Sequence, residues 1–442
     1  MANYQDLQIA IVGAGMGGLG AALALAKRGF KNIDVYETAS NLGFVGAGIQ
    51  MPPNVGRILS SLGCWDGIEK EATAVNGTSI RQGSSNEELT HVDMPNIKEK
   101  YGYAHLCGHR SSLAGNLYEA CQREASIKFH FSSSLVQVSR FTPKVHFTIR
   151  PREGAPYEVE ADVLLGADGI KSQARIDLLR ELNAEQEEIE TGQAAYRIML
   201  TREQMAHDPE MLALLDSDDV VRWVGERRHI IAYSISNKSI YNLSSVQPDK
   251  SFAAAPSVTY TTKGSKSTML DVFGDFCPLV TKMLDLVPEG EVCEWRLRMY
   301  KPLPAWTHGS VALLGDACHP TLPHLSQGAA MAIEDGAVIA EVLSMAPSTD
   351  ADSLAKALRA YQLSRKEWCS NLVEMAYMSS LTLHLGEGKA REERDRMFRE
   401  RGSDGSVPDK WASPDVQKMI YSNDCVANIR RDFQQLYAQA EA

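Results

Sequence analysis

The sequence lacks any hydrophobic run long enough to cross a membrane, and it lacks an excess of positive charge. A membrane span needs about 20 consecutive apolar residues, and no window of the 442 residues reaches that length. Lys and Arg number 45 against 56 Asp and Glu, a formal net charge of −11. We therefore expect no membrane span and no nucleic-acid partner. The 44% hydrophobic and 23% charged content is typical of a globular protein with an ample core.

The sequence also lacks paired cysteines, internal repeats and low-complexity tracts. Its eight cysteines are scattered and none forms a CxxC pair, which predicts neither a structural metal site nor a disulfide framework. The first residues are polar and run straight into a strand, unlike a signal peptide. The last residues, AQAEA, match no targeting tripeptide. Together these features favour a cytoplasmic protein without a metal.

The first 37 residues follow the pattern strand, glycine loop, helix, strand. Residues 7–12 (LQIAIV) predict a buried strand, residues 19–28 a helix, and residues 32–37 (NIDVYE) a second strand that ends on an acid. The loop between the first strand and the helix is GAGMGG, residues 13–18. A GxGxxG motif in that position is typical of dinucleotide binding.

Each glycine of this loop has a separate physical task. Gly13 permits the tight turn, Gly15 lets the backbone approach a pyrophosphate, and Gly18 lets the helix pack close to the strand. Glu37 lies 24 positions after Gly13. A carboxylate there can accept hydrogen bonds from ribose hydroxyls, so this half of the pattern favours dinucleotide binding over a chance glycine loop.

A second motif lies late in the chain, in VALLGDACHPTLPHLSQGAAMAIEDG at residues 311–336. A short apolar strand ends at Gly315 and Asp316, and prolines, Pro323 among them, then prevent regular structure. From Gln327 the pattern turns helical, and small residues such as Gly328 stand near its start. The N–H groups and the positive dipole of a helix start favour electron-rich or anionic ligand atoms. The stretch therefore predicts half of a cofactor cradle.

A third motif, ADVLLGADGIKSQAR at residues 161–175, repeats the theme of a strand that ends on an acid. Its buried strand runs to Gly166, and Asp168 follows. Open α/β sheets bind ligands at the carboxyl ends of their strands. Asp168 and Asp316 both occupy such ends, so chance is a poor explanation for the three motifs together.

The remaining segments predict the connections and a second sheet. Residues 46–63 predict a loop and then a helix, either packed against the cofactor or forming a plain connection. Arg110 starts a helix after a strand end, where it reaches a phosphate or makes a surface salt bridge. Residues 127–160 predict a four-stranded meander. Residues 176–290 predict an antiparallel sheet with helices, and a charge run at 388–402 predicts a solvated helix face. Residues 294–300 lead back to the cofactor half.

The order and spacing of the three motifs strongly resemble the single-component, class A flavin aromatic hydroxylases with the p-hydroxybenzoate hydroxylase fold. The resemblance covers nearly the whole chain, and it is strongest to salicylate 1-hydroxylases and 6-hydroxynicotinate 3-monooxygenases. The segment KWASPDVQKMIYSNDCVAN is also similar to the tails of fungal salicylate hydroxylase-like proteins. Where the family often has an asparagine near the flavin, this chain has Ala330.

The resemblance implies an α/β fold: a Rossmann-like FAD-binding domain of the GR2 type, an inserted antiparallel-sheet substrate domain, and a helical C-terminal region. On this basis we expect a discontinuous FAD-binding domain, a substrate-binding domain in two pieces, and the helical region, with limits as follows. The FAD-binding domain takes residues 1–75, 103–180 and 291–345, the substrate-binding domain 76–102 and 181–290, and the helical region 346–442.

The resemblance further implies FAD as cofactor, with NADH or NADPH and O₂ as co-substrates. By motif match, the residues that bind FAD are Gly13, Gly15, Gly18, Glu37, Arg110, Asp168, Gly315, Asp316 and Gly328. Within this set Glu37 would hold the adenosine ribose and Asp316 the ribitol chain. Asp168 belongs to a motif that serves both FAD and the nicotinamide cofactor. A homodimer is possible.

The implied reaction is hydroxylation of a small phenolic aromatic acid through a flavin C4a-hydroperoxide. Salicylate is the preferred substrate on the strength of the three ordered motifs and the tail. Attack at its carboxyl-bearing carbon would release CO₂ and restore aromaticity as catechol. The alternatives are another phenol or heteroaromatic acid, such as 6-hydroxynicotinate, and an FAD-binding protein without turnover. A phenol with a pKa near 10 needs a base at neutral pH, and histidine is suited to that task.

Candidates for the substrate end lie in the predicted inserted sheet and in the proline loop. His229 and Tyr233 are four apart and face the same side of a strand, so they line one pocket or form a half-exposed strand pair. Arg197 pairs a substrate carboxylate or makes a structural salt bridge. Pro323 and His324 lie beside the reacting edge of the flavin by motif match. Tyr196 and Trp223 offer flat walls for a ring, although core packing is the default for aromatic residues in strands.

Overall fold

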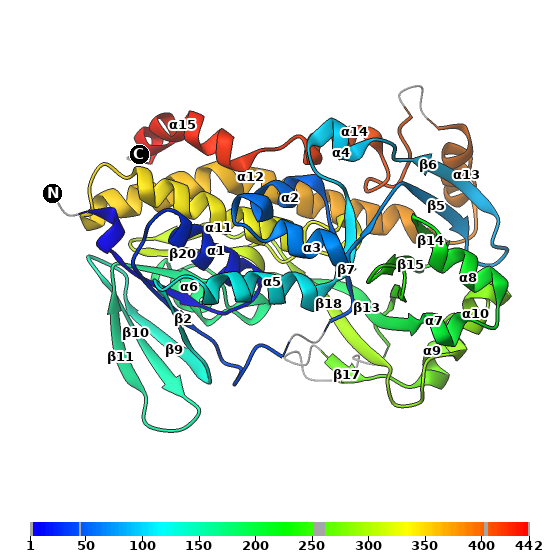
Figure 1. Ribbon diagram of the computed structural model, residues 1–442, viewed down its shortest axis with the longest axis horizontal. Helices are drawn as coiled ribbons and strands as arrows, with labels where there is room; N and C mark the ends of the chain where they lie inside the picture. Colours follow the sequence, from blue (N-terminus) through cyan, green and yellow to red (C-terminus); the bar gives the residue numbers. More distant parts are fainter. Residues whose placement is uncertain (1–2, 44–45, 251–260, 402–404, 441–442) are drawn as a thin grey trace.

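The computed structural model describes residues 3–43, 46–250, 261–401 and 405–440. Figure 1 shows an elongated molecule with two lobes. A parallel sheet and its helices form one lobe, an eight-stranded sheet and its helices form the other, and the long helix α12 (Ala351–Leu383) extends along both. This mixed α/β architecture confirms the expected fold class.

A six-stranded sheet in the order β19-β20-β12-β1-β2-β8 forms the centre of the first lobe. Its pairs are parallel except for β19 with β20. The predicted buried strands are all present, because continuous apolar runs suit a parallel sheet that is covered on both faces. The strands are β1 (Gln8–Val12), β2 (Asn32–Tyr36), β8 (Ile127–His130), β12 (Val163–Gly166), β19 (Thr307–His308) and β20 (Val311–Leu313).

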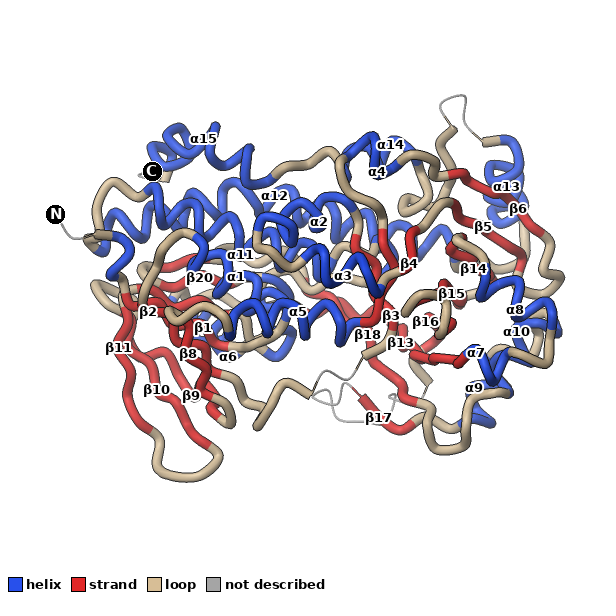
Figure 2. Tube along the Cα trace, in the orientation of Figure 1, coloured by secondary structure: helices blue, strands red, loops and turns tan. Residues whose placement is uncertain are grey.

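Helices cover one face of this sheet, and a small antiparallel sheet lies against the other (Figure 2). The covering helices are α1 (Met16–Lys27), α5 (Arg110–Gln122) and α11 (Gly328–Met345); α6 (Gln173–Glu181) packs against the small sheet. The small sheet has the order β11-β10-β9, with β9 (Ser133–Arg140), β10 (Val145–Pro151) and β11 (Tyr157–Ala161).

The predicted four-stranded meander at 127–160 is wrong in its first strand. β8 pairs in parallel with β2 and joins the large sheet instead. Alternation along a strand does not reveal its neighbour, since pairing depends on distant chain.

The second lobe is built on an eight-stranded sheet in the order β17-β18-β13-β16-β15-β14-β5-β6. β14 pairs in parallel with β5, which attaches the β5–β6 hairpin to the sheet edge. The strands are β5 (Gly77–Gln82), β6 (Glu88–Asp93), β13 (Glu188–Thr201), β14 (Asp219–Gly225), β15 (Arg228–Ile235), β16 (Ile240–Pro248), β17 (Thr261–Lys263) and β18 (Cys293–Tyr300). Its helices are α7 (Arg202–Met205), α8 (Pro209–Asp216), α9 (Lys266–Val272) and α10 (Pro278–Asp285).

One strand departs from the expected division of the chain. Residues 291–345 are expected to belong to the FAD-binding domain. Strand β18 lies within that range, yet it pairs with β13 and β17 in the eight-stranded sheet. We therefore propose that the inserted unit ends after Tyr300. Residues 251–260 of that unit lie outside the described residues.

A three-stranded sheet, β3-β7-β4, connects the two lobes with three short helices. The segment 46–63 was expected to be a loop and a helix, but it begins with strand β3 (Gly48–Met51), which pairs with β7 (Leu106–His109). The other elements here are β4 (Thr73–Ala74), α2 (Pro53–Ser61), α3 (Trp65–Glu71) and α4 (Ile97–Tyr101).

The chain after α11 is helical, as expected, but the charge run is not simply solvated. The helices are α12, α13 (Lys389–Glu400), α14 (Pro414–Tyr421) and α15 (Cys425–Gln439). In α13 Phe398 is fully buried, and buried Arg394 donates to the carbonyl of Leu383 at 3.0 Å. This arginine therefore caps the end of α12.

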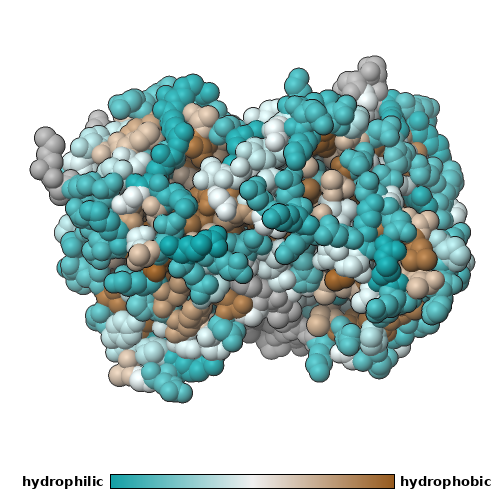
Figure 3. All heavy atoms as spheres, viewed as in Figure 1, coloured by the Kyte–Doolittle hydropathy of each residue, from teal (hydrophilic) through white to brown (hydrophobic). Residues whose placement is uncertain are grey.

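The surface in Figure 3 is mostly hydrophilic, with hydrophobic groups in separate patches. Among the described residues, no helix combines the length and the apolar character that a membrane crossing requires.

Candidate active site

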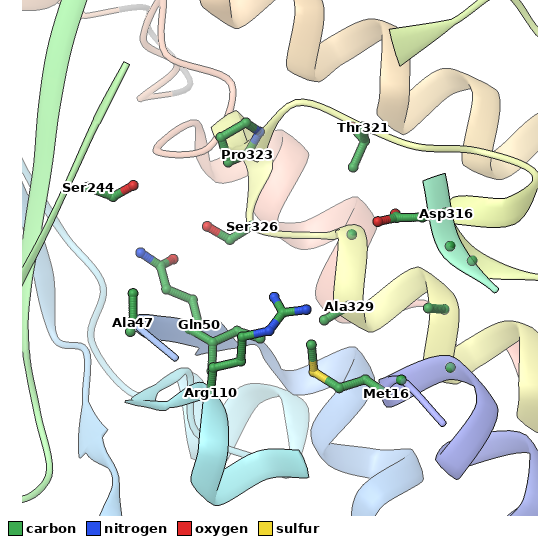
Figure 4. Close-up of a pocket in the computed structure, with 18 of the residues that line it drawn as sticks. Met16, Ala47, Gln50, Arg110, Ser244, Asp316, Thr321, Pro323, Ser326 and Ala329 are labelled. Atoms are coloured by element: carbon green, nitrogen blue, oxygen red, sulfur yellow. The ribbon is translucent and has the colours of Figure 1, made fainter. Parts of the chain in front are cut away.

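A cavity of about 370 Å³ opens between the carboxyl ends of the parallel strands and one face of the eight-stranded sheet. Figure 4 shows side chains from both lobes converging on it. Its wall combines all three sequence motifs with the inserted sheet. The lining residues are Gly15, Met16, Gly17, Ala47, Gly48, Ile49, Gln50, Arg110, Ala167, Gly169, Arg197, Ile231, Tyr233, Ser244, Leu314, Gly315, Asp316, Thr321, Pro323, Ser326, Gly328, Ala329 and Ala332.

The glycines of the first loop differ in how closely other atoms approach them. Gly13 has a φ of +101°, and a Cβ there would lie 2.3 Å from the carbonyl oxygen of Ala167. A Cβ on Gly18 would lie 1.9 Å from the carbonyl oxygen of Gly13. A Cβ on Gly15 would meet no atom within 4 Å, and Gly15 lines the cavity. Gly13 and Gly18 therefore shape the turn, and Gly15 leaves the backbone open to a ligand.

Two helix N-termini meet at this cavity. Helix α1 begins after Gly15, and α11 begins at Gly328, which also lines the cavity. The first N–H groups of a helix have no intrahelical partner and carry its positive dipole end. Neither start has a capping side chain, so both ends remain available to an electron-rich ligand.

Arg110 and Asp316 bring opposite charges to the same cavity. Arg110 starts α5, and Asp316 lies in the short turn after β20; Figure 4 shows the arginine projecting into the cavity and the acid on the opposite wall. Neither side chain has a hydrogen-bonding or ion-pair partner within the described parts of the chain. Burial lowers the pKa of Arg110 and raises that of Asp316, and each charge counteracts the shift of the other.

These groups match the chemistry of FAD. A cation without a partner suits a pyrophosphate, and an acid without a partner accepts hydrogen bonds from polyol hydroxyls. The open backbone at Gly15 and the two helix starts add N–H donors. An arginine and an aspartate enclosed in one cavity, neither of them in a direct ion pair among the described residues, are costly for the empty protein, so a ligand carrying both complementary groups fits the cavity.

Four predicted cofactor residues do not line the cavity: Gly13 and Gly18, which shape the turn, and the acids Glu37 and Asp168. Glu37 accepts hydrogen bonds from the N–H groups of Ala14 (2.7 Å) and Ala39 (2.8 Å), so the backbone orients its carboxylate. Asp168 is likewise engaged: it accepts from the N–H of Gln173 at 2.7 Å and from the hydroxyl of Ser172. Burial raises the pKa of Asp168, and these hydrogen bonds oppose the shift.

The inserted sheet supplies the other wall. Arg197 on β13, Ser244 on β16 and Ile231 on β15 are cross-strand neighbours, and all three line the cavity. Tyr233 lies two residues beyond Ile231 on the same face, and Pro323 lines the cavity from the proline loop. The Arg197 guanidinium stacks over Trp295 at 5.0 Å and has no carboxylate partner among the described residues.

Tyr196 and Trp223 do not reach the cavity, which corrects the expectation that they form its flat walls. Both are buried in a separate core cluster with residues of α8–α10. Neighbouring side chains along a strand point to opposite faces, so Tyr196 points away where Arg197 points in. Trp223 donates its indole N–H to Asn86 at 2.8 Å.

His229 and His324 lie beside the cavity without lining it. His229 is 2% exposed and His324 1% exposed, and their ring centroids are 5.2 Å apart. Burial lowers the pKa of both histidines well below the usual value, with a further contribution from His384. Both rings are therefore neutral at neutral pH.

His319 belongs to a buried ion network behind the cavity. Its Nε2 lies 2.6 Å from Asp335, which also accepts from Arg365 (2.9 Å) and from the N–H of Gly315 (3.0 Å). Cys318, His319 and Asp335 bring three potential metal ligands together. Because Asp335 already receives three donors, we interpret the cluster as structural: its hydrogen bonds connect α11 to α12 and to the turn that carries Asp316.

Several lining residues escaped sequence reasoning, and Gln50 is the most polar of them. It lies on the unexpected strand β3, and its Oε1 is 3.3 Å from His105. Its buried Nε2 has no hydrogen-bond partner among the residues that the structure describes. The neighbouring Gly48 leaves space for Tyr233, because a Cβ there would lie 2.7 Å from the tyrosine ring. The glycines and prolines of 46–63 were the available signal, but they did not identify a strand.

Comparisons with known proteins agree with this geometry. Residues 6–259 match the family described as FAD binding domain. An FAD-dependent monooxygenase, ntnJ from Nectria sp, is 31% identical over 418 residues, which cover 94% of this chain and 93% of that protein. The 6-hydroxynicotinate 3-monooxygenase of Pseudomonas fluorescens is 31% identical over 386 residues, 84% of this chain and 91% of the relative.

The same fold occurs in a crystal structure of CtdE in complex with FAD and a substrate. Its TM-score is 0.80 at 18% sequence identity, and the match covers 99% of this chain and 100% of the other.

Proposed function

The chain belongs to the FAD-binding aromatic hydroxylase family of monooxygenases, and from that premise we propose that it uses NADH or NADPH and O₂ to hydroxylate a small phenolic aromatic acid. One observation carries the proposal: a single cavity joins Arg110 and Asp316, which suit FAD, to Arg197 and Tyr233, which suit an aromatic acid. Salicylate, converted to catechol with loss of CO₂, is the substrate that we propose first.

Each group at the cofactor end has a specific task in this proposal. The backbone at Gly15 and the start of α1 would bind the pyrophosphate together with Arg110. Asp316 would accept hydrogen bonds from the ribitol, and Glu37 from the adenosine ribose. The start of α11 would face the pyrimidine edge of the flavin, where the positive helix end stabilises negative charge.

When bound, FAD supplies the oxidation of NADH or NADPH and the activation of O₂, and the protein supplies alignment and exclusion of water. Pro323 gives a rigid wall between the two ends of the cavity. The motif that contains Asp168 would support FAD and the nicotinamide cofactor through its neighbours Ala167 and Gly169, which line the cavity.

Arg197 would bind the substrate carboxylate. Burial and the nearby Arg110 lower its pKa, but an arginine keeps its charge at neutral pH. A guanidinium without a carboxylate partner can donate to both carboxylate oxygens of an aromatic acid in a bidentate pair. This fixes which ring carbon faces the flavin.

His229 would accept the phenolic proton, and Tyr233 would donate a hydrogen bond to the resulting phenolate. Burial raises the pKa of Tyr233 far above its usual value, so it stays a donor at neutral pH. The lowered pKa of His229 keeps the base unprotonated. Removal of the proton makes the ring electron-rich enough to be hydroxylated.

A heteroaromatic hydroxy acid is the second candidate substrate, and the 31% identity to a 6-hydroxynicotinate 3-monooxygenase favours it. Such a substrate would need the same two groups as salicylate: a carboxylate opposite Arg197 and an ionisable hydroxyl near Tyr233. The third possibility, an FAD-binding protein without turnover, is disfavoured because the substrate end retains its charged and polar groups.

The test is to load the purified protein with FAD, add NADH or NADPH, and follow reductant oxidation, O₂ uptake and product with salicylate and with 6-hydroxynicotinate. Salicylate should stimulate both rates and yield catechol. A hydroxylated product that retains its carboxylate would exclude the decarboxylating reaction. If no aromatic acid stimulates oxidation of either reductant, the monooxygenase proposal fails.

A further inference from the structure

One short motif of the sequence, Pro-Pro-Asn at residues 52–54, has no part in the proposed function. It joins strand β3, which lines the cavity, to helix α2, which packs against α11. A proline ring fixes its own φ, so the two prolines make this connection stiff. Asn54 follows them in the first turn of α2 and is 2% exposed. Its side chain is therefore held in a defined place relative to the cavity wall.

The Asn54 amide directs both of its N–H groups at helix α11. Its Nδ2 donates to Oε1 of Gln327 at 3.1 Å and to Oε1 of Glu334 at 2.8 Å. A carboxylate only accepts hydrogen bonds, so Glu334 fixes which end of the amide faces α11. The Oδ1 of Asn54 is buried and has no hydrogen-bond partner within the described parts of the chain. An unsatisfied buried carbonyl is costly, and a leucine of similar size would avoid that cost.

Both acceptors belong to the cavity end of α11. Gln327 is the N-cap residue of this helix, and Glu334 lies about two turns further on. The first helical residues, Gly328 and Ala329, line the cavity, and Figure 4 shows Ala329 there. Asn54 thus ties the start of α11 to β3, a strand that lines the same cavity.

The same hydrogen-bond network continues to the turn after β20. Glu334 also accepts from Arg365 at 2.6 Å, and Arg365 donates to Asp335 at 2.9 Å. Asp335 in turn accepts the N–H of Gly315 at 3.0 Å. The network therefore connects the start of α11 with the turn that supplies the predicted ribitol-binding acid, and Asn54 joins it to α2.

We propose that Asn54 is a positioning residue that holds the start of α11 against the flavin and so raises the reduction potential of bound FAD. This inference rests on the FAD-binding part of the proposed function, in which this helix end faces the pyrimidine edge. NADH or NADPH passes a hydride to FAD, which gains two electrons and one proton and becomes an anion. The positive end of a helix stabilises that negative charge only within about one turn. A small displacement of the helix start therefore weakens the effect.

Asn54 touches no FAD atom in this proposal and acts through Gln327 and Glu334. Loss of its two donors would free the Gln327 side chain and the helix start that it anchors. The reduced flavin would then lose part of its stabilisation, and FAD would become harder to reduce.

The experiment uses protein with one FAD bound, without aromatic substrate, reduced slowly in the absence of O₂ together with a reference dye of known potential. The absorbances of flavin and dye give the ratio of reduced to oxidised flavin at each dye ratio. Asn54→Leu keeps the side-chain volume and removes both donors. It should lower the flavin ratio by roughly 3- to 10-fold, within the range of a helix end acting on a partly buried charge. A tenfold fall corresponds to about 30 mV for a two-electron couple.

The matched control is Gln193→Leu. The Gln193 amide also links two elements, since its Nε2 donates to Ser380 on α12 at 2.7 Å, and its buried Oε1 has no hydrogen-bond partner among the described residues. Both variants should lose stability in urea, but only Asn54→Leu should change the flavin ratio. A wild-type flavin ratio in Asn54→Leu would overturn the positioning role and leave the proposed function intact.

Gln327→Ala keeps the test decisive if Asn54→Leu does not fold. It preserves the hydrogen bond between Asn54 and Glu334 and removes only the tether at the helix start, so the flavin ratio should fall in the same direction. The double variant should match Asn54→Leu alone, because both changes break the same hydrogen bond. A wild-type ratio in Gln327→Ala, or additive effects in the double variant, would contradict the proposal.

Failure of the proposed function gives different results. A wild-type protein that takes up no FAD would overturn both the inference and the proposed function. If FAD binds and the shift in Asn54→Leu is present, but no aromatic acid stimulates NADH or NADPH oxidation, only the proposed hydroxylation fails.

Discussion

At the scale of single residues, the site is defined by charges that the protein leaves without partners. Arg110, Asp316 and Arg197 face one cavity, and within the described residues none of them is paired with an opposite charge at close range. Most buried charges in the same protein are paired, for example Arg365 with Glu334 and Asp335. Because an unpaired buried charge is costly, these exceptions support the proposal that the three residues bind ligands.

Replacing Asp316 with Ala should weaken FAD binding more than it changes the choice of substrate. Loss of hydrogen bonds to a charged group costs about 1.5–3 kcal/mol, which corresponds to a rise in the FAD dissociation constant of roughly 10- to 150-fold. Fluorescence titration of the apoprotein measures this constant, with the exposed Glu374→Ala on α12 as control. Unchanged FAD affinity would contradict the placement of Asp316.

Replacing Arg197 with Gln should raise KM for aromatic acids by roughly 10- to 100-fold, the range expected when a charge-assisted pair is lost. Phenols without a carboxylate should show little change, since they make no ion pair with Arg197. Arg197→Lys should recover part of the loss, because it restores the charge without the bidentate geometry. Equal effects on phenols with and without a carboxylate would refute this role.

At the scale of elements, two helices must approach closely so that both of their N-termini reach the cavity. Helices α1 and α11 pack against each other. Glycine makes this possible: a Cβ on Gly336 would lie 2.7 Å from the backbone N and Cα of Ala21. The position of the two N-termini therefore depends on a contact one to two turns behind them.

Gly336→Ala should destabilise the protein and weaken FAD binding, because the helices must separate. Overpacking costs about 1–3 kcal/mol, and the better helix propensity of alanine offsets about 1 kcal/mol of it. Gly115→Ala in α5 is the matched control: a Cβ there would meet nothing within 4 Å, so it should be neutral or stabilising. Urea unfolding and FAD titration of both variants measure the difference, and equal stability would exclude the close-packing explanation.

At the scale of the whole molecule, buried neutral histidines tie stability to pH. Burial lowers the pKa of His105 to about 3 and of His384 to about 3, and lowers His229 and His324 well below their usual value. As pH falls below about 6.5, the unfolded chain binds protons that the folded protein does not. Their contribution to stability is therefore present above that pH and is lost as the pH falls. Glu341, with a pKa raised to about 7 by burial, acts in the opposite direction.

His105 offers a direct test, because both of its ring nitrogens are engaged within the protein, by Tyr421 at 2.8 Å and Gln50 at 3.3 Å. His105→Gln should be less stable than wild type at pH 7. Between pH 6.5 and 5 the difference in the free energy of unfolding between wild type and variant should narrow by about 1.4 kcal/mol per pH unit, since the variant lacks one proton-linked group. Urea unfolding at several pH values measures the gap, and a constant gap would contradict the assignment.

The local motifs were predictable because the backbone conformation and residue types that each one needs are set within a few neighbouring residues. Gly13 needs a positive φ for the turn, buried strands need apolar runs, and the helix after Gln327 needs small residues at its start. These are steric properties of the nearby backbone. The sequence thus determined the parallel sheet, the two acid-ended strands and the likeness to FAD-dependent hydroxylases.

Only the tertiary structure decided which side chains share the cavity. Tyr196 and Arg197 are adjacent in sequence and point to opposite faces of β13. Only Arg197 lines the cavity, because the pairing of β13 within the sheet fixes which of its faces meets the cavity and which meets the core cluster of Tyr196. Three other features also depend on parts of the chain that are distant in sequence. They are the pairing of β8 with β2, the pairing of β3, which carries Gln50, with β7, and the contact of His384 with His229. Such contacts follow from the packing of whole elements, and no local pattern encodes them.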